Sequence, residues 1–175
     1  MPAWKRWKTP HEQVVDASAE VDIFASPQET WSLIRPAENA VHLDPSTTRA
    51  FHVPGTPLGV GEMQGFISRL NGREYVAMIE VLEELEGRYA LTRQIGIEDD
   101  AHRMAYILHE TRSGTRLELR STFTIPTEPW DNTDALIDDV RRRHSEMAQR
   151  VKWVLESDLP YFGKPRSPGE QVRKL

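Results

Sequence analysis

From Thr47 to Ile125 the sequence alternates between apolar and polar residues, with short turn sequences between the alternating stretches. Such alternation is typical of β-strands, because successive side chains point to opposite faces of a sheet. The turns are of hairpin type: Asn71-Gly72 favours a tight two-residue turn, and Glu86-Gly87 and Ser113-Gly114 serve similarly. Consecutive strands with short turns predict an antiparallel meander and argue against a parallel nucleotide-binding sheet. The expected strands are 47–53, 62–70, 74–82, 88–95, 102–110 and 115–125.

One strand and two short helices are expected before this meander. Between Val14 and Ala25 apolar residues alternate with mostly polar ones, which predicts a half-buried strand. The stretch Ser26-Pro27-Gln28-Glu29 then predicts a helix start, because Ser26 can cap the helix and Glu29 can complete a capping box. Pro36 ends this helix, and a second short helix is expected over 37–43.

A single long helix is expected after the meander, starting near 131–133 and running to about 157. Its apolar residues recur at helical spacing and form one stripe, and His144 lies on that stripe. A curved sheet of this kind cannot close on itself, so the helix should cover its concave face. The predicted fold class is therefore α+β: a curved seven-stranded antiparallel sheet wrapped around a long C-terminal helix, with two short helices after the first strand.

Length and composition limit the possible functions. A chain of 175 residues is expected to form one domain, and 38% hydrophobic against 28% charged residues indicates a lean core. The net charge of −5 argues against nucleic-acid binding. The absence of cysteine excludes disulfides, thiolate catalysis and Cys-based metal sites, and it favours a reducing, cytoplasmic environment. We expect no stable membrane insertion, since no apolar run approaches the roughly 20 residues that span a bilayer.

The two ends of the chain differ in composition from the rest. Residues 1–13 form a basic arm that carries Trp4 and Trp7; its indoles either pack on the domain or meet a membrane surface or partner, or the arm stays loose. Residues 158–175 are rich in proline and polar residues and are expected to be a tail. Known catalytic and phosphate-binding motifs are absent, and the six histidines are not spaced as a metal set, so no metal or cofactor is expected.

The order of elements resembles the helix-grip fold of the START-like (SRPBCC) superfamily, in particular its bacterial polyketide cyclase/dehydrase and lipid-transport branch. The strand-to-helix stretch from Val21 to Trp31, the loop from Pro54 to Glu62 and the terminal amphipathic helix carry this resemblance, which covers about residues 14–157. The motifs are architectural rather than catalytic. The resemblance implies a cavity between the long helix and the sheet that binds a small, mainly apolar molecule, and a lean core fits a partly hollow interior.

Inward-facing residues should line this cavity. Arg93 shares a face with Leu91 and is expected to point inward, where it needs a carboxylate such as Glu80 or an anionic ligand group, unless it reaches solvent at the strand end. His144 is expected either to contact ligand as an anchor or proton donor, or to be a core histidine bonded to a neighbour. The inward faces of 62–70 and 74–82 stay open. The full set of expected ligand-binding residues is Met63, Phe66, Met78, Leu91, Arg93, Tyr106, Leu117, Leu119, His144, Met147 and Val151.

Three functions are compatible with the sequence. The favoured one is binding of a hydrophobic molecule (a lipid, polyketide-like or aromatic metabolite) without chemistry, because no convincing catalytic pair is present. The second is a cyclase or dehydratase in which His144, Arg93 or Tyr106 transfers protons or stabilises an enolate. The third is a regulatory protein that acts through its basic arm or through a homodimer formed by pairing of sheets.

Overall fold

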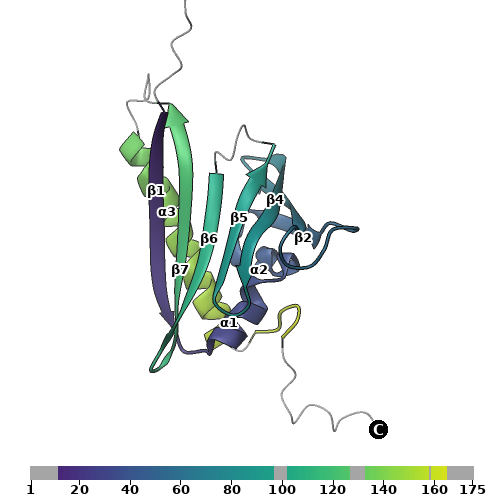
Figure 1. The fold of residues 1–175 in the computed structure, drawn as a ribbon, viewed down its shortest axis with the longest axis vertical. Helices are drawn as coiled ribbons and strands as arrows, with labels where there is room; N and C mark the ends of the chain where they lie inside the picture. The colour runs from purple at the N-terminus through teal and green to yellow at the C-terminus, as the bar shows by residue number, and fades with distance from the viewer. Residues whose placement is uncertain (1–11, 97–101, 127–132, 158, 165–175) are drawn as a thin grey trace, which may run out of the picture.

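The computed structural model describes residues 12–96, 102–126, 133–157 and 159–164. Seven antiparallel strands form one open, curved sheet in the order β1-β7-β6-β5-β4-β3-β2, so β1 and β2 are its two edges. This arrangement confirms the α+β fold class expected from the alternation (Figure 1). The strands are β1 (Glu12–Ile23), β2 (Thr47–His52), β3 (Met63–Leu70), β4 (Arg73–Leu85), β5 (Tyr89–Ile95), β6 (His102–Thr111) and β7 (Gly114–Pro126).

The turn chemistry behaves as the sequence predicts. Asn71 and Gly72, between β3 and β4, both have positive φ angles of 50° and 76°, as a primed hairpin turn requires. β4 is longer than the expected strand, and its pairing with β5 shifts between Val81 and Glu83. Beyond this bulge Glu84, not Glu83, lies on the same face as Val81.

Within the described ranges, four helical segments accompany the sheet. They are α1 (Pro27–Ile34), the short 3₁₀ turn η1 (Ala37–Asn39), α2 (Ala40–Leu43) and the long α3 (Thr133–Glu156). The capping box of α1 is formed: the Glu29 amide donates to Ser26 Oγ (3.2 Å), and the Ser26 amide donates to the Glu29 carboxylate (2.9 Å). The expected second helix is split, since it begins as η1. The start of α3 was expected near 131–133; residues 131 and 132 lie outside the described residues, and Thr133 is the first residue of this helix.

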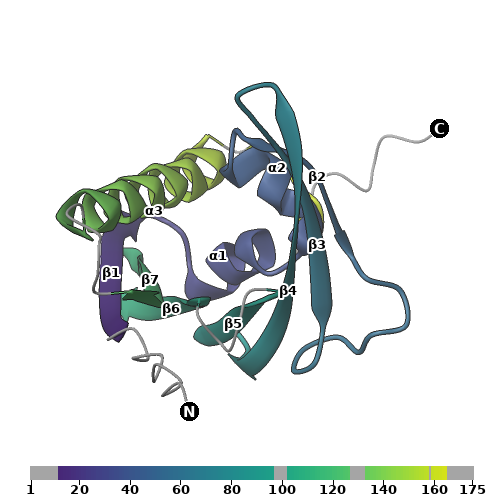
Figure 2. The ribbon, with the colours of Figure 1, turned by 90° about the horizontal axis from the view of Figure 1, so that it is seen from above.

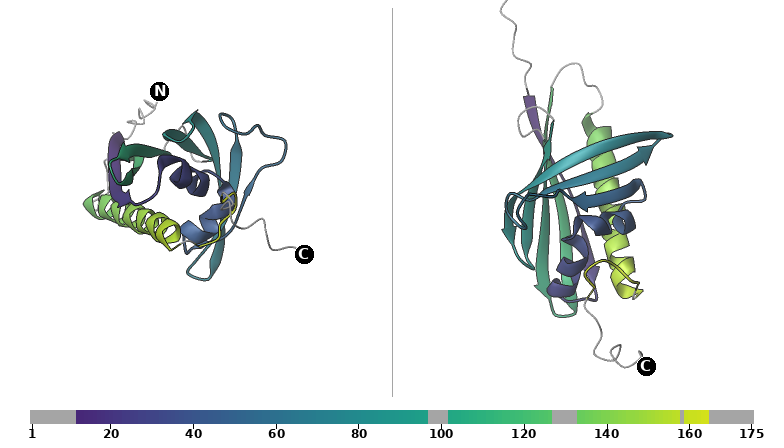
Figure 3. Two further views of the ribbon diagram at one scale, coloured as in Figure 1. Left: turned by 90° about the horizontal axis from the view of Figure 1, so that it is seen from below. Right: turned by 90° about the vertical axis from the view of Figure 1, so that its right-hand side faces the viewer.

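The long helix lies along β1 and β7 and crosses the open side of the curved sheet, while α1 closes one end of the space between them (Figures 2 and 3). Val151 and Val154 on α3 are buried against Leu117 and Leu119 of β7. Each fully buried leucine or valine stabilises the fold by about 1.5–3 kcal/mol. No helix in the described ranges is long and apolar enough to cross a membrane.

Residues 159–164, which the composition assigned to the tail, pack on the helices. The buried Asn39 side chain donates to the Leu33 and Phe162 carbonyls (2.9 Å each) and accepts from the Phe162 amide (2.8 Å). Tyr161 and Leu159 contact the hydrophobic core, and the Tyr161 hydroxyl lies 3.1 Å from Ser32 Oγ. Residues 1–11 of the predicted arm 1–13 and residues 165–175 lie outside the described part of the chain, and Glu12 and Gln13 belong to β1.

Candidate functional site

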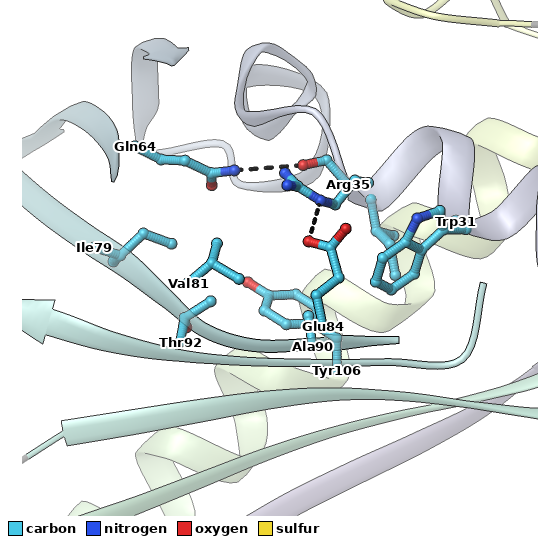
Figure 4. A pocket seen from close by; sticks show the side chains of 10 residues that line it. Trp31, Arg35, Gln64, Ile79, Val81, Glu84, Ala90, Thr92 and Tyr106 are labelled. Carbon is cyan, nitrogen blue, oxygen red and sulfur yellow. Dashed lines mark hydrogen bonds and ion pairs between the residues drawn. The ribbon is translucent and has the colours of Figure 1, made fainter. Parts of the chain in front are cut away.

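A pocket opens between α1 and the concave face of β3–β6 (Figure 4). Its enclosed space is small, about 30 Å³, and the volume rises to about 360 Å³ only when the open mouth is included. The pocket is mainly apolar, with a polar group of side chains at one side. Its lining residues are Trp31, Ile34, Arg35, Gln64, Ile79, Val81, Glu84, Ala90, Thr92 and Tyr106.

The register of three neighbouring strands creates this pocket. Ala90 of β5 pairs with Tyr106 of β6, and Thr92 pairs with both Val81 and Met104, so these side chains share the concave face. Ala90 and Thr92 are small, and they leave space in front of the larger Tyr106 ring. The space directly beneath α3 is occupied instead by the core, so the pocket lies under α1 rather than under the long helix, where it was expected.

The polar side of the pocket is built around Arg35, at the C-terminal end of α1. Its Nε donates to Glu84 Oε2 at 2.7 Å, and its Nη2 donates to Glu62 Oε2. Glu62 also accepts bonds from the Gln64 side chain (2.9 Å) and from the Gly59 amide (3.2 Å). The loop before β3, the β4 bulge and the end of α1 therefore meet in one hydrogen-bonded network.

Burial and hydrogen bonding act in opposite directions on Glu62. Its side chain is only 3% exposed, which by itself would raise the carboxyl pKa. The bonds from Arg35, Gln64 and Gly59 outweigh that burial and lower the pKa to about 2. For Arg35, burial alone would lower the pKa, and the two carboxylates raise it. Glu62 and Arg35 are thus both charged at neutral pH.

His52 lies beside this network, on the face of β2 that pairs with Gln64. Its Nδ1 is 3.4 Å from Glu62 Oε1 and is buried without a hydrogen-bond partner among the described residues. The imidazole is therefore the nearest titratable group on β2 to the buried carboxylate.

The Tyr106 hydroxyl points into the pocket toward Val81 and Thr92 (Figure 4). Burial raises the pKa of this phenol to about 12, so it stays protonated at neutral pH. No residue in the described ranges forms a hydrogen bond with it. Thr92, its neighbour, directs its own hydroxyl to the Met104 carbonyl at 3.2 Å. The phenol is therefore a free donor and acceptor inside a mostly apolar pocket.

A second group of polar side chains, linked by hydrogen bonds, lies toward the opposite end of the concave face. His144 Nε2 is 2.8 Å from the fully buried Ser121 Oγ, which is 3.2 Å from His102 Nε2. His102 Nδ1 is in turn 3.3 Å from Gln94 Oε1. Burial lowers the pKa of both imidazoles, and the neighbouring His102 lowers that of His144 further, so both are neutral at pH 7. His144 is thus bonded to a neighbour, and its contact with a ligand stays a prediction.

Four residues expected to face the cavity lie on the opposite, convex face. Arg93 pairs with Arg103, and Leu91 pairs with Ala105. On β6, Arg103 and Ala105 point to the face opposite that of the inward Met104 and Tyr106, so Arg93 and Leu91 are on the convex face as well. Arg93 therefore does not point inward. Its expected partner is correct, since its Nη2 lies 2.7 Å from Glu80 Oε2 on the convex face.

Met63 and Met78 are outward for the same reason, because they alternate with Gln64 and Ile79, which line the pocket. β3, β4 and β5 carry apolar side chains on both faces, so alternation alone does not identify the inner one.

The remaining candidates face inward, as expected, but differ in what they contact. Tyr106 lines the pocket. Leu117, Leu119 and Val151 are fully buried in the core, and Met147 packs against that core. Phe66 lies two residues after Gln64 on β3, so both side chains are on the inner face of the sheet. Ligand contact by these residues stays a prediction.

The polar network was missed by sequence reasoning. Arg35 was assigned no functional role, and Glu62 was named only as the end of the loop that carries the resemblance and the start of a strand. The signal that was present is the tight loop around Gly59 and Gly61, which have positive φ angles of 87° and 85° and turn an amide toward Glu62. Among the described residues no cluster of three His, Asp or Glu side chains is arranged to hold a metal ion.

A second, more open groove lies on the outside of the helices, near the packed 159–164 segment. It has a volume of about 600 Å³ including open solvent. It is separate from the concave face and shares no residue with the pocket under α1. Its lining residues are Val41, His42, Arg150, Trp153, Val154, Leu159 and Pro160.

No protein-family model matches the sequence. No curated protein matches it either. Solved structures do match the fold. The crystal structure of Ara h 8.0201 has a TM-score of 0.66 and 14% identity, and the match covers 83% of this chain and 99% of that one.

Two further structures share the same architecture. The di-domain ARO/CYC StfQ from the steffimycin biosynthetic pathway has a TM-score of 0.69 and 17% identity over 83% of this chain, which spans about half (51%) of that protein. The Polyketide_cyc-like protein Cgl2372 from Corynebacterium glutamicum has a TM-score of 0.58 and 15% identity, with 83% and 94% coverage. At these identities the likeness establishes the fold alone.

Proposed function

Because the chain has the helix-grip fold of the START-like superfamily, we propose that it binds a small, mainly apolar molecule in the pocket between α1 and the concave face. A lipid fragment, a polyketide-like compound or an aromatic metabolite fits this description. The observation that carries the proposal is the Tyr106 hydroxyl, which lies inside the pocket with no bonding partner among the described residues.

The physical properties of the pocket support binding. Ligand pockets are typically mostly apolar and equipped with a few polar anchors. This pocket has walls formed by Trp31, Ile79 and Val81, and a polar side formed by Arg35 and Glu84. The Tyr106 hydroxyl has no partner among the described residues, so a ligand with a matching polar atom can hydrogen-bond to it.

Catalysis is less well supported by the geometry. A cyclase or dehydratase needs two polar groups at one ligand position, and Arg93, His144 and Tyr106 were the candidates. Arg93 lies on the convex face, and His144 is bonded to Ser121. Tyr106 alone combines a place in the pocket with a free hydroxyl. The likeness to an ARO/CYC protein keeps this second function open to test. The basic arm that would serve a regulatory role lies outside the described residues.

Native extraction tests the proposal first. Protein purified without detergent is denatured in organic solvent, and the released small molecules are identified by mass spectrometry. We expect a compound at near-stoichiometric amount in the wild type.

A pocket-filling variant then locates the site. Ala90→Leu adds a bulky side chain in front of Tyr106, and we expect it to abolish co-purification of the compound. Ala105→Leu is the matched control, because Ala105 precedes Tyr106 on β6 and faces the opposite side. A compound that is retained by Ala90→Leu, or lost equally from both variants, would contradict the proposed site.

A further inference from the structure

The groove on the outside of the helices, the outer groove, is roomier than the pocket under α1. Without the open solvent around it, its volume is about 290 Å³, against about 30 Å³ for the pocket. This value lies just below the lower end of the roughly 300–1,000 Å³ that ligand pockets occupy. The outer groove therefore has room for a small molecule.

Two walls of the outer groove are formed by α3 and α2. Arg150, Trp153 and Val154 lie on one side of α3, because residues three and four positions apart share a helix face. α2 lies beside this end of α3 and adds Val41 and His42 (Figure 2). Trp153 is 55% exposed. Its indole offers a ligand a wide apolar contact surface.

The chain that follows α3 forms the third wall with Leu159 and is held in place by hydrogen bonds. The Leu159 amide donates to the Val154 carbonyl at 3.3 Å. The buried Asn39 side chain bonds to both the carbonyl and the amide of Phe162. A wall that is already ordered loses little conformational freedom when a ligand binds, so the outer groove is a pre-formed site.

Arg150 gives the outer groove an uncompensated positive charge. Its side chain is partly buried and has no ion-pair or hydrogen-bond partner among the described residues. The other arginines of α3, which are Arg141, Arg142 and Arg143, all pair with carboxylates of the same helix. No acidic side chain lines the outer groove in the described part of the chain. An anionic group on a ligand would therefore meet a cation with no competing partner.

From the apolar walls and this unpaired guanidinium we infer that the outer groove is a second binding site, which takes a small molecule with an apolar body and a single carboxylate. The planar guanidinium of Arg150 presents paired N–H donors that match the two oxygens of a carboxylate. The apolar body packs on Trp153 and Val41. The site is independent of the proposed function, because it shares no residue with the pocket under α1.

Three probes separate the contributions of the charge and of the apolar body. Phenylpropionate carries both, phenylpropanol has the same body without the charge, and acetate has the charge alone. Each is titrated into the isotope-labelled full-length protein at pH 7 and low salt. The NMR signals of the Trp153 indole N–H and the Val41 methyl groups report binding at the outer groove.

We expect saturable shifts of these signals with phenylpropionate, at least fivefold weaker binding of phenylpropanol, and no saturation with acetate. Added salt should weaken the binding of phenylpropionate, because ions screen a partly exposed charge pair. Equal affinities for the acid and the alcohol, or signals that stay unmoved by phenylpropionate, overturn the inference. Neither result decides the proposed function, which is tested at Ala90 and Tyr106.

A charge variant assigns the effect to Arg150. Arg150→Gln removes the charge, so we expect the affinity for phenylpropionate to fall at least fivefold and to approach that for phenylpropanol. Arg141→Gln is the matched control, because Arg141 is an exposed arginine of the same helix that pairs with Asp138 at 3.6 Å. It should leave the affinity unchanged. Equal losses in the two variants would show that the overall charge of the helix is responsible, and they would overturn the inference.

A second copy of the chain is the other occupant to be tested. We expect wild type and Trp153→Ala to have the same mass in sedimentation equilibrium. A dimer that this substitution converts to a monomer would assign the outer groove to self-association and overturn the inference. Should either variant fail to fold, the probe series on the wild type still decides the inference.

Discussion

The Nε atom of Arg35 lies 2.7 Å from Oε2 of Glu84, although the two residues are 49 positions apart in the chain. This contact joins the end of α1 to the strand bulge of β4, and the same guanidinium reaches Glu62 at the start of β3. The three side chains give an otherwise apolar pocket one polar side. Their charges make this part of the fold sensitive to mutation and to acid.

Glu62→Gln should destabilise the protein at neutral pH. The Glu62 pKa is about 2 in the folded state against 4.5 as a model value, so the carboxylate contributes stability of about 3 kcal/mol above pH 4.5. That contribution is lost as the pH falls from about 4.5 toward 2, because the unfolded chain then binds the proton first. Urea unfolding across this pH range measures the effect. Glu74→Gln, in an exposed pair with Arg69, is the control and should change stability by less than about 1 kcal/mol.

The two inward histidines predict a second pH effect near neutrality. Burial lowers the pKa of His102 and His144 below 6.5, so the unfolded chain takes up protons more readily than the folded one. Stability should therefore fall as the pH drops below 6.5. A His102→Gln/His144→Gln double variant should show a shallower fall between pH 7.5 and 5.5, measured by thermal unfolding. Identical slopes for the two proteins would contradict the assignment.

Gly65 should not tolerate a side chain while Phe51 is present. A Cβ at position 65 would lie 2.5 Å from Cζ of the Phe51 ring, which covers this glycine from the neighbouring strand. We expect Gly65→Ala to cost about 1–3 kcal/mol in chemical denaturation. In the Phe51→Ala background the same substitution should cost much less, and a double-mutant cycle with no coupling would refute the contact.

Asn39 is expected to hold the 159–164 segment to the helices. Asn39→Asp retains the oxygen that accepts from the Phe162 amide but loses the donors to the Leu33 and Phe162 carbonyls. It also places an unpaired charge in a fully buried position, so we expect a loss of about 3 kcal/mol or more. Hydrogen exchange of the Phe162 amide should accelerate beyond the rest of the core. Uniform protection across both regions would argue against this anchoring role.

Local signals account for most of the fold that could be predicted from the sequence. Asn71-Gly72 has few alternatives to a tight turn, and the Ser26–Glu29 capping box depends on residues three positions apart. The inward face of β7 was also predictable, because its outward residues Arg116 and Arg120 are charged while Leu117 and Leu119 are apolar. In these cases neighbours in sequence decide the structure.

The site depends on relations that sequence alternation does not encode. β3, β4 and β5 have apolar residues on both faces, so Arg93 was assigned to the wrong side. The bulge after Val81 moves Glu84 to the concave face, and no residue at this position predicts a bulge from the sequence. Arg35 meets its two carboxylates only through tertiary contacts. Tyr106 was found because it lies in a clearly apolar set next to the β7 face.

Direct contact between ligand and pocket tests the central claim most simply. Isotope-filtered NMR on labelled protein with unlabelled phenylpropanol detects protons that lie close to the bound molecule. We predict contacts from the probe to the Ala90 methyl group and to the Tyr106 ring, which lie side by side on the neighbouring strands β5 and β6. Contacts confined to Trp153 and Val41 in the outer groove would contradict the account.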